Sequence, residues 1–230
     1  MILTCRQMQD AEDAAFARGV DASDLMDEAG WGIAQAIQQF FPQPGHAILF
    51  LGKGNNAGDA LVAGKHLLEV GWSIGAWCAY PDKDFKALPA RHWADLCEQV
   101  ALYSDVAEIA SLQGPIVLLD GLVGIGAAHG PLRDPLASAV RAMNELRQRR
   151  HASIVALDLP SGLNPETGVP EESCVQADLT LTIAHVKTPL LADAAVSAVG
   201  RLAVIPLRDL ADAKASDGAA DSTVLTAATL

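Results

Sequence analysis

The sequence has little of what several classes of protein require. Its 230 residues include four cysteines, which are widely spaced and form no C-x-x-C pair: Cys5, Cys78, Cys97 and Cys174. Zinc centres and disulfide frameworks need clustered or numerous cysteines, so the sequence favours neither. We expect these four thiols to be buried or unreactive in a reducing compartment.

Positive charge is also scarce. The chain carries 16 Lys and Arg residues against 28 Asp and Glu residues, which gives a formal net charge of −12. A protein that binds nucleic acid needs a basic surface to neutralise phosphates, so we expect no nucleic-acid partner. The one basic cluster, at residues 141–150, is typical of the exposed end of a helix.

Long hydrophobic runs are absent as well. The N-terminus reaches Asp10, Glu12 and Asp13 without the apolar stretch of a signal peptide. No run of about 18 apolar residues, the length that a membrane helix needs, occurs in the chain. We therefore expect a cytoplasmic protein without a membrane partner.

Hydrophobic residues as such are plentiful, at 50% of the chain, so a large core can be buried. The length suits one α/β domain. Apolar residues at helical spacing predict a first helix that is capped by Thr4 and closed by Gly19. A second helix is predicted to begin at Ser23 or Asp24 and to end before Pro42.

Short apolar segments and amphipathic segments then alternate. Strands are predicted at residues 47–51, 72–80, 116–119, 154–157, 179–183 and 202–205, and helices at 60–68, 90–100 and 136–150. This alternation indicates α/β architecture with a mostly parallel sheet, a Rossmann-like three-layer α/β/α sandwich with two extra N-terminal helices. Residues 1–208 are predicted to form the domain, and residues 209–230 have the composition of a linker or tail that is mobile or loosely docked.

The first predicted strand is followed by Gly52-Lys53-Gly54-Asn55-Asn56-Ala57-Gly58-Asp59. Ligands of open α/β sheets bind at the carboxyl ends of the strands, where small residues let the backbone approach and helix starts offer free N–H groups to phosphate. Asn55 and Asn56 add amide oxygens for a cation or a ribose, and Asp59 can cap the helix or accept hydroxyl hydrogen bonds. The alternative is a tight turn in which Asn tolerates left-handed angles. The segment also approximates a dinucleotide fingerprint, so a dehydrogenase with Asp82 as its ribose carboxylate stays a rival.

Two later strand ends carry carboxylates. Asp120 is followed by three nearby glycines, which predicts a loop that wraps a ligand, or else an Asx-turn. Asp158 leaves another apolar strand, and Pro160 stiffens the turn that presents Ser161. A buried carboxylate has a raised pKa and can act as an acid or base near neutrality. Because G-x-S-x-G is absent and no histidine accompanies Ser161 in a motif, a serine hydrolase is not favoured.

Oxygen-bearing residues thus dominate all three strand ends. Such groups suit a hard cation and do not suit zinc or iron. One full carboxylate among neutral oxygens favours a weakly charged ion such as potassium.

Together these segments resemble the NAD(P)H-hydrate epimerase family, also called the YjeF N-terminal domain family, from about Thr4 to Pro206. The family's G-x-G-N-N-G-G-D-G loop corresponds to residues 52–60, its D-A-L-L-G-T-G loop to 120–126, and its D-[IL]-P-S-G-L turn to 158–163. The late strand at 177–182 and Lys187 also match.

The resemblance implies an isomerase that interconverts the R and S epimers of hydrated NADH and NADPH, so that a separate dehydratase can repair the cofactor. It implies a potassium ion at Asn56, Asp120 and Ser161, Asp158 as the catalytic acid or base, and a homodimer. The implied substrate-binding residues are Asn55, Asn56, Ala57, Gly58, Asp59, Gly124, Ile125, Gly126, Ala127, Ala128, His129, Gly130 and Asp158.

Several positions depart from the family pattern. Ala57 and Ala60 stand where the family usually has Gly; if position 57 needs a positive φ, Ala costs about 1 kcal/mol there. Ile125 replaces a Thr, and Thr188-Pro189 after Lys187 leaves the role of that lysine open. A catalytically impaired nucleotide-binding protein on the same fold is therefore the alternative function. Residues 222–226 resemble the start of the dehydratase domain of bifunctional relatives, so the tail is predicted to lead toward such a domain.

Overall fold

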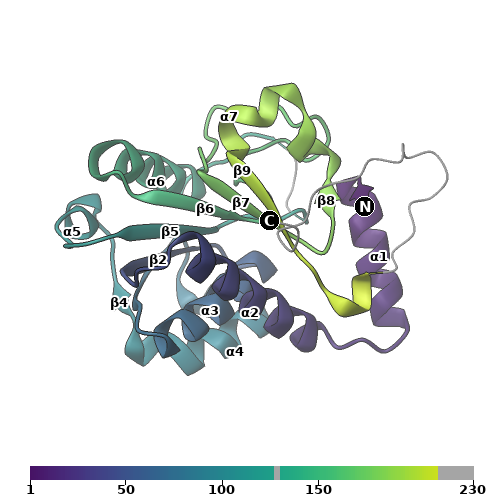
Figure 1. Ribbon diagram of the computed structural model, residues 1–230, viewed down its shortest axis with the longest axis horizontal. Helices are drawn as coiled ribbons and strands as arrows, with labels where there is room; N and C mark the ends of the chain where they lie inside the picture. The colour runs from purple at the N-terminus through teal and green to yellow at the C-terminus, as the bar shows by residue number, and fades with distance from the viewer. Residues whose placement is uncertain (127–129, 212–230) are drawn as a thin grey trace.

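A parallel sheet of seven strands forms the centre of the computed structural model, which describes residues 1–126 and 130–211 (Figure 1). The strand order is β4-β3-β2-β5-β6-β7-β9, and every neighbouring pair is parallel. The strands are β2 (His46–Leu51), β3 (Ser73–Cys78), β4 (Ala101–Leu102), β5 (Ile116–Gly121), β6 (Ser153–Leu157), β7 (Leu179–Ile183) and β9 (Arg201–Ile205). The chain runs outward from β2 to β4 and then returns to β5, so the direction of winding reverses between β2 and β5.

The central strands β2, β5 and β6 are mostly apolar because both of their faces are covered. In β2, Leu49 and Leu51 belong to the core on one side of the sheet, whereas Ile48 and Phe50 belong to the core on the other side. All six residues of β5 are buried. This explains why the strands appear in the sequence as continuous apolar runs and lack an alternating pattern.

Helices form a layer on each face of the sheet (Figure 1). One layer contains α2 (Ala22–Phe40), α3 (Asn55–Glu69) and α4 (Ala87–Leu96), and the other contains α5 (Val106–Ala110) and α6 (Leu136–Arg150). The predicted three-layer α/β/α sandwich is therefore confirmed, and the basic cluster does form the end of α6. None of the helices within the described ranges combines the length and apolarity that a bilayer crossing requires.

The described part of the chain also contains one short helix and several 3₁₀ turns. They are α7 (Val196–Val199) and the 3₁₀ turns η1 (Asp82–Asp84), η2 (Cys97–Gln99), η3 (Thr188–Leu191), η4 (Asp193–Ala195) and η5 (Arg208–Leu210).

The first helix, α1 (Cys5–Ala17), lies apart from both layers (Figure 1). The strand before it, β1 (Ile2–Leu3), pairs in parallel with β8 (Val186–Lys187) to form a separate two-stranded sheet. The predicted Thr4 cap is confirmed: its Oγ1 accepts the Gln7 N–H at 3.1 Å, and the Gln7 side chain accepts the Thr4 N–H at 2.9 Å. This reciprocal capping box gives α1 a defined start.

Some predicted boundaries were wrong. The cap of α2 is Asp21, whose Oδ1 accepts the Ser23 N–H at 2.7 Å, and neither Ser23 nor Asp24 has that role. Helix α3 begins at Asn55, so residues 55–59 form its first turns and are not a loop. Elements β1, β4, β8 and α5 were not predicted, because two to five residues are too few to show a periodic pattern. Residues 127–129 and 212–230, with the predictions made for them, lie outside the described residues.

Candidate functional site

The candidate site lies where β2, β5 and β6 end, at the reversal of strand order. Glycines allow the segments to meet there. A Cβ on Gly52 would lie 1.9 Å from the carbonyl oxygen of Leu122, and a Cβ on Gly121 would lie 2.8 Å from the Cβ of Ala60. The backbone after β2 therefore packs directly on the backbone after β5, which brings residues far apart in the sequence to one edge.

Asn56, Asp120 and Ser161 meet at this edge, as the sequence predicted. The Ser161 hydroxyl donates to Asp120 Oδ1 at 2.6 Å, and the Ser161 N–H donates to Asp120 Oδ2 at 2.8 Å. The Asn56 amide donates to the carbonyl oxygens of Asp120 and Val123, both at 3.2 Å. We call Asn56, Asp120, Ser161 and the Val123 carbonyl the oxygen cluster.

Asp120 is the one charged member of the oxygen cluster. Burial raises the pKa of its carboxyl to about 6, although the hydrogen bonds from Ser161 and Leu122 act in the opposite direction. Its side chain is fully buried and forms no salt bridge within the described part of the chain. The cluster therefore lacks a positive charge that would favour the ionised carboxylate.

The Asn56 side chain can serve either as donor or as acceptor. Turning its amide by half a turn would place Oδ1 where Nδ2 now meets the two carbonyl oxygens. In that orientation the amide, the carbonyls, the hydroxyl and the carboxylate would all present oxygen to a common centre.

A buried ion pair lies close to the oxygen cluster in sequence and at the same end of the sheet. Lys187, at 1% exposure, donates from Nζ to Asp158 Oδ1 and, at 2.6 Å, to the carbonyl oxygen of Ile183. The Ile183 N–H donates to the same Oδ1 at 3.1 Å. Asp158 itself adopts a left-handed backbone with φ +65°, a conformation that Asp tolerates better than most residues. Its carboxylate is thus held by an ammonium and an amide.

Two further carboxyl groups interact electrostatically with this ion pair. Asp59, from α3, has a pKa well above its ordinary range because it is shielded from water and faces the charges of Asp158 and Glu12. Glu12, from α1, has a pKa raised to about 7 by burial and then by the charge of Asp158. The sequence offered no reason to place Glu12 in the site. Its position four residues after Met8, on the same face of a predicted helix, was the one pattern that could have indicated it.

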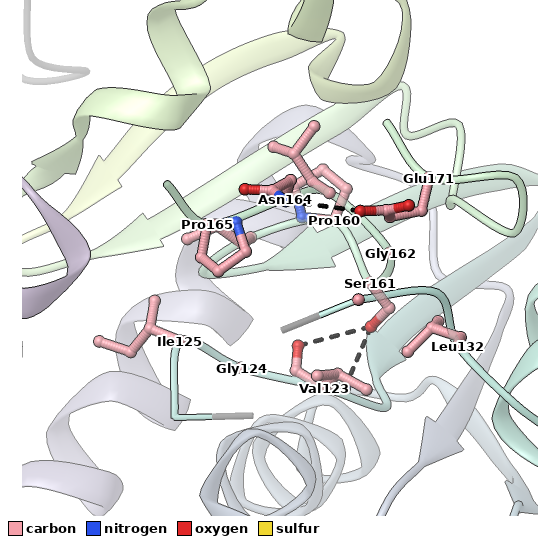
Figure 2. Close-up of a pocket in the computed structure, with 13 residues that line it drawn as sticks. Val123, Gly124, Ile125, Leu132, Pro160, Ser161, Gly162, Asn164, Pro165 and Glu171 are labelled. Carbon is pink, nitrogen blue, oxygen red and sulfur yellow. Dashed lines mark hydrogen bonds between the residues drawn. The ribbon is translucent and has the colours of Figure 1, made fainter. Parts of the chain in front are cut away.

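A pocket opens beside Ser161 (Figure 2). Its volume is about 420 Å³, part of which is open to solvent. The predicted substrate residues Gly124, Ile125 and Gly130 line it, together with the turn after β6 and the side chains of Leu132, Asn164 and Glu171. The Asn164 amide donates to Glu171 at 3.4 Å across one wall. Predicted contacts at residues 127–129 lie outside the described residues.

The other predicted substrate residues take different positions. Ala57 is completely buried in the core, and Gly58 packs on Met26, so neither lines the pocket; a ligand could reach them only through backbone atoms. Ala57 and Ala60 are helical and lack a positive φ, so the expected strain at position 57 is absent. Asn55 is exposed at the start of α3, and Gly126 lies beside Gln9 of α1.

A parallel, doubly wound sheet with polar groups gathered at its switch point places the chain in the class of α/β proteins that bind ligands at this edge. The family of the YjeF-related protein N-terminus has a model that matches residues 22–189. The chain belongs to this family, as its motifs predicted.

Named relatives agree with this assignment. The chain is 30% identical over 190 residues to an NAD(P)H-hydrate epimerase of Cenarchaeum symbiosum, covering 81% of this chain and 86% of the relative. It is 33% identical over 199 residues to a bifunctional NAD(P)H-hydrate repair enzyme of Leishmania infantum. That match covers 85% of this chain but only 35% of the relative, so the chain spans about a third of the bifunctional protein.

The fold also matches a solved structure. The crystal structure of the yeast protein YNL200c superposes with a TM-score of 0.74 over 97% of both chains, at 18% sequence identity. This likeness supports the architecture described above.

Proposed function

We propose that the protein is an NAD(P)H-hydrate epimerase, which interconverts the R and S forms of hydrated NADH and NADPH. The buried Asp158–Lys187 pair at the ligand-binding edge of the sheet is the observation that carries this proposal. Two neighbouring carboxyl groups, Glu12 and Asp59, have raised pKa values and support it. The name of the archaeal relative, which matches over most of both chains, supports it.

Epimerisation at the hydrated ring carbon needs a proton and a negative charge in the same place. When the hydroxyl leaves as water, the carbon becomes planar and shares a positive charge with the ring nitrogen. Water can then return to either face. A fixed carboxylate beside this carbon would stabilise the planar cation and guide the returning water. Asp158 supplies such a carboxylate, because Lys187 and the Ile183 N–H hold it in one position.

The oxygen cluster fits a potassium ion. It offers one carboxylate with neutral amide, hydroxyl and carbonyl oxygens. Within the described residues, no three His, Cys, Asp or Glu side chains gather as they would around a zinc or iron ion. We propose that Asn56, Asp120 and Ser161 bind potassium. The ion would supply the positive charge that Asp120 lacks and would attract the diphosphate of the substrate.

Two rival functions are less well supported. An impaired nucleotide-binding protein was suggested by Ala57 and Ile125, yet Ala57 causes no backbone strain, which leaves the apolar Ile125 as its remaining support. A dehydrogenase would use Asp82 to bind a ribose. Asp82 is exposed in η1 and accepts the N–H of its neighbour Lys83 at 2.8 Å.

The remaining parts of the proposal concern partners and location. The names of the bifunctional relatives support a dehydratase domain as a covalent or separate partner. The four free cysteines are compatible with a reducing cytoplasm. A homodimer is proposed on family likeness alone.

The Asp158→Asn substitution tests the proposed function. We expect the rate of R-to-S conversion, followed by NMR or chromatography of an epimer-enriched hydrate, to fall roughly 10²–10³-fold, the range attributed to loss of one group that stabilises charge in the transition state. The affinity for the hydrate should change by less than about 10-fold, because Asn keeps the shape of the side chain and tolerates a positive φ.

The matched control is Asp95→Asn, which removes one exposed carboxylate from α4. It should retain wild-type conversion. Thermal unfolding of each variant shows whether it is folded. A wild-type protein that leaves the epimer ratio at its uncatalysed rate would contradict the proposed function, and a fully active Asp158→Asn protein would contradict the role of Asp158.

A further inference from the structure

We propose that Glu12 of α1 is a second catalytic residue of this site, which gives a proton to the leaving hydroxyl and takes it back when water returns. This inference rests on the proposed epimerisation. It assigns to the site described above a residue from outside the sheet, which transfers the proton while Asp158 stabilises the planar cation.

Helix α1 is anchored through the strand that precedes it. Strand β1 pairs with β8 in a register that places Leu3 opposite Lys187. The helix therefore starts two residues after a backbone position that lies beside the lysine of the buried ion pair. The capping box at Thr4 then sets the direction of α1, which lies next to β8 in Figure 1. A helix held in this way presents one constant face to the strand ends.

That face is the one that carries Glu12. Cys5, Met8 and Glu12 follow one another at spacings of three and four, which places them on the same side of a helix. Cys5 belongs to the apolar cluster around Leu159, one residue after Asp158. Gln9, in the turn before Glu12, donates to the carbonyl oxygen of Ile125 at 3.2 Å. The inner face of α1 thus contacts the segments that follow both β5 and β6.

The neighbouring acids of α1 have other surroundings. Asp10 forms an exposed pair with Arg6 at 3.0 Å, and Asp13 is exposed. Glu12 is half-buried, and no hydrogen bond or salt bridge to it exists among the described residues. Its carboxyl group is therefore available to a ligand at the site.

The charges around Glu12 explain why it can hold a proton. The groups that face it are Asp158 and Lys187 from the strand ends and Asp13 from its own helix, and Asp59 of α3 interacts with it in turn. The ammonium of Lys187 is already bonded to Asp158. Burial and the remaining negative charge raise the pKa of Glu12 to about 7, which suits a group that must give and regain a proton near neutrality.

The step balances without any co-reactant. The Glu12 carboxyl proton moves to the hydroxyl of the hydrated ring carbon, and the C–O bond breaks with its electron pair on the departing water. The lone pair of the ring nitrogen stabilises the resulting cation next to the Asp158 carboxylate. Water then forms a C–O bond on either face, and its extra proton returns to Glu12. No atom is oxidised or reduced.

Replacement of Glu12 by Gln tests this assignment. We expect kcat for epimerisation to fall roughly 100-fold or more, with the affinity for the hydrate little changed. In the wild type, kcat should decline as the pH rises through about 7, because Glu12 loses its proton there. The Glu12→Gln protein should lack this decline, whereas Glu12→Asp should retain it with partial activity.

The matched control is Asp10→Asn, which removes the same charge from an exposed position of α1 that pairs with Arg6. Its rate and its pH profile should equal those of the wild type. If wild type is active and Glu12→Gln behaves like Asp10→Asn, the inference is overturned while the proposed function stands. If wild type does not epimerise the hydrate, both fail, and the two failures are distinguishable.

A second measurement needs no substrate. The pKa of Glu12 in the folded protein, about 7, is above its ordinary value of 4.5, so between these values the folded state binds more protons than the unfolded state. Urea unfolding should therefore show wild type gaining stability relative to Glu12→Gln as the pH falls from about 7 to about 4.5. A stability difference that is constant over this range would show that the pKa of Glu12 is not raised in the folded protein, and the inference would be overturned.

Discussion

The Asp158–Lys187 pair combines two features that are each unfavourable alone. A lysine at 1% exposure and a buried carboxylate would each destabilise the fold without a partner of opposite charge. Together they satisfy each other, and Lys187 also reaches the Ile183 carbonyl. The side chain that the proposed mechanism places beside the ring carbon is thus held in position by Lys187, which need not touch the substrate.

Replacing Lys187 by Met should lower the free energy of unfolding by about 3–5 kcal/mol, because it leaves the buried Asp158 carboxylate without a counter-charge. The double variant Asp158→Asn with Lys187→Met should lose much less than the sum of the two single losses, since neither charge is then left alone. Urea denaturation of the four proteins measures both effects. Additive losses would mean that the two side chains are not energetically coupled.

At the scale of residues, the sequence could identify groups that stand directly after a strand. Asn56, Asp120 and Ser161 were grouped from this rule and from the family resemblance, and the structure brings them together. Lys187 was matched to the family's lysine with its role left open, and Glu12 was given no role, for a physical reason. Lys187 lies in a two-residue strand, and Glu12 lies on a helix whose docking depends on that strand, so neither position follows from a local pattern.

The helix α1 is attached to the molecule mainly through its start and its inner face. Loss of the capping box by Thr4→Ala should reduce the free energy of unfolding by about 1 kcal/mol. Backbone amides of α1 should exchange with deuterium faster than in wild type, because the helix opens more readily from its first turn. Epimerisation should fall with this loosening, since Glu12 is carried by the same helix.

Asp105→Ala is the matched control for this change. Asp105 caps α5 on the other side of the sheet through the Ala107 N–H at 2.9 Å. The Asp105→Ala substitution should lower the free energy of unfolding by a similar amount. The amides of α1 should exchange as slowly as in wild type, and epimerisation should be retained. Equal exchange of α1 in both variants would show that its capping box does not anchor the helix.

Among the elements, the long ones were predicted well. The predicted bounds of α6 and β7 agree with the structure. A 15-residue amphipathic pattern clearly indicates a helix, and a five-residue run of Leu, Thr and Ile clearly indicates a strand. The start of α3 was misplaced, since Gly54, Asn55 and Asn56 resemble a turn by composition. In the structure, the contacts of Asn56 with the carbonyls after β5 favour its helical position, and such tertiary contacts cannot be read from local propensity.

At the scale of the whole molecule, the oxygen cluster joins segments from three strands. An ion bound there would stabilise the folded state by an amount that grows with its concentration, about 2.7 kcal/mol at 100 times Kd. We therefore expect the Tm of wild type to be higher in potassium chloride than in choline chloride of equal ionic strength.

The Asp120→Asn protein should lose this potassium-specific increase because its one ligand carboxylate is gone. Asp95→Asn, with the same change of net charge on the exposed surface of α4, should keep it. Equal Tm values for wild type in the two salts would contradict the proposed potassium site.

The architecture as a whole followed from the alternation of apolar strands and amphipathic helices, and so did the edge of the sheet at which polar residues gather. What did not follow is the path of the chain before Ala22. The two-stranded pairing of β1 with β8 depends on residues separated by more than three quarters of the chain, and no periodicity records such a pairing.

This pairing bears on how the protein should be handled. Because Ile2 pairs with Val186 and Leu3 with Lys187, an affinity tag or fusion partner attached at residue 1 would emerge close to the strand that carries the buried lysine. Labels and immobilisation chemistry are better placed on an exposed position of α4, such as Asp95, which lies on one of the outer layers. Weak turnover in an N-terminally extended preparation would therefore report the effect of the attachment as well as the activity of the protein.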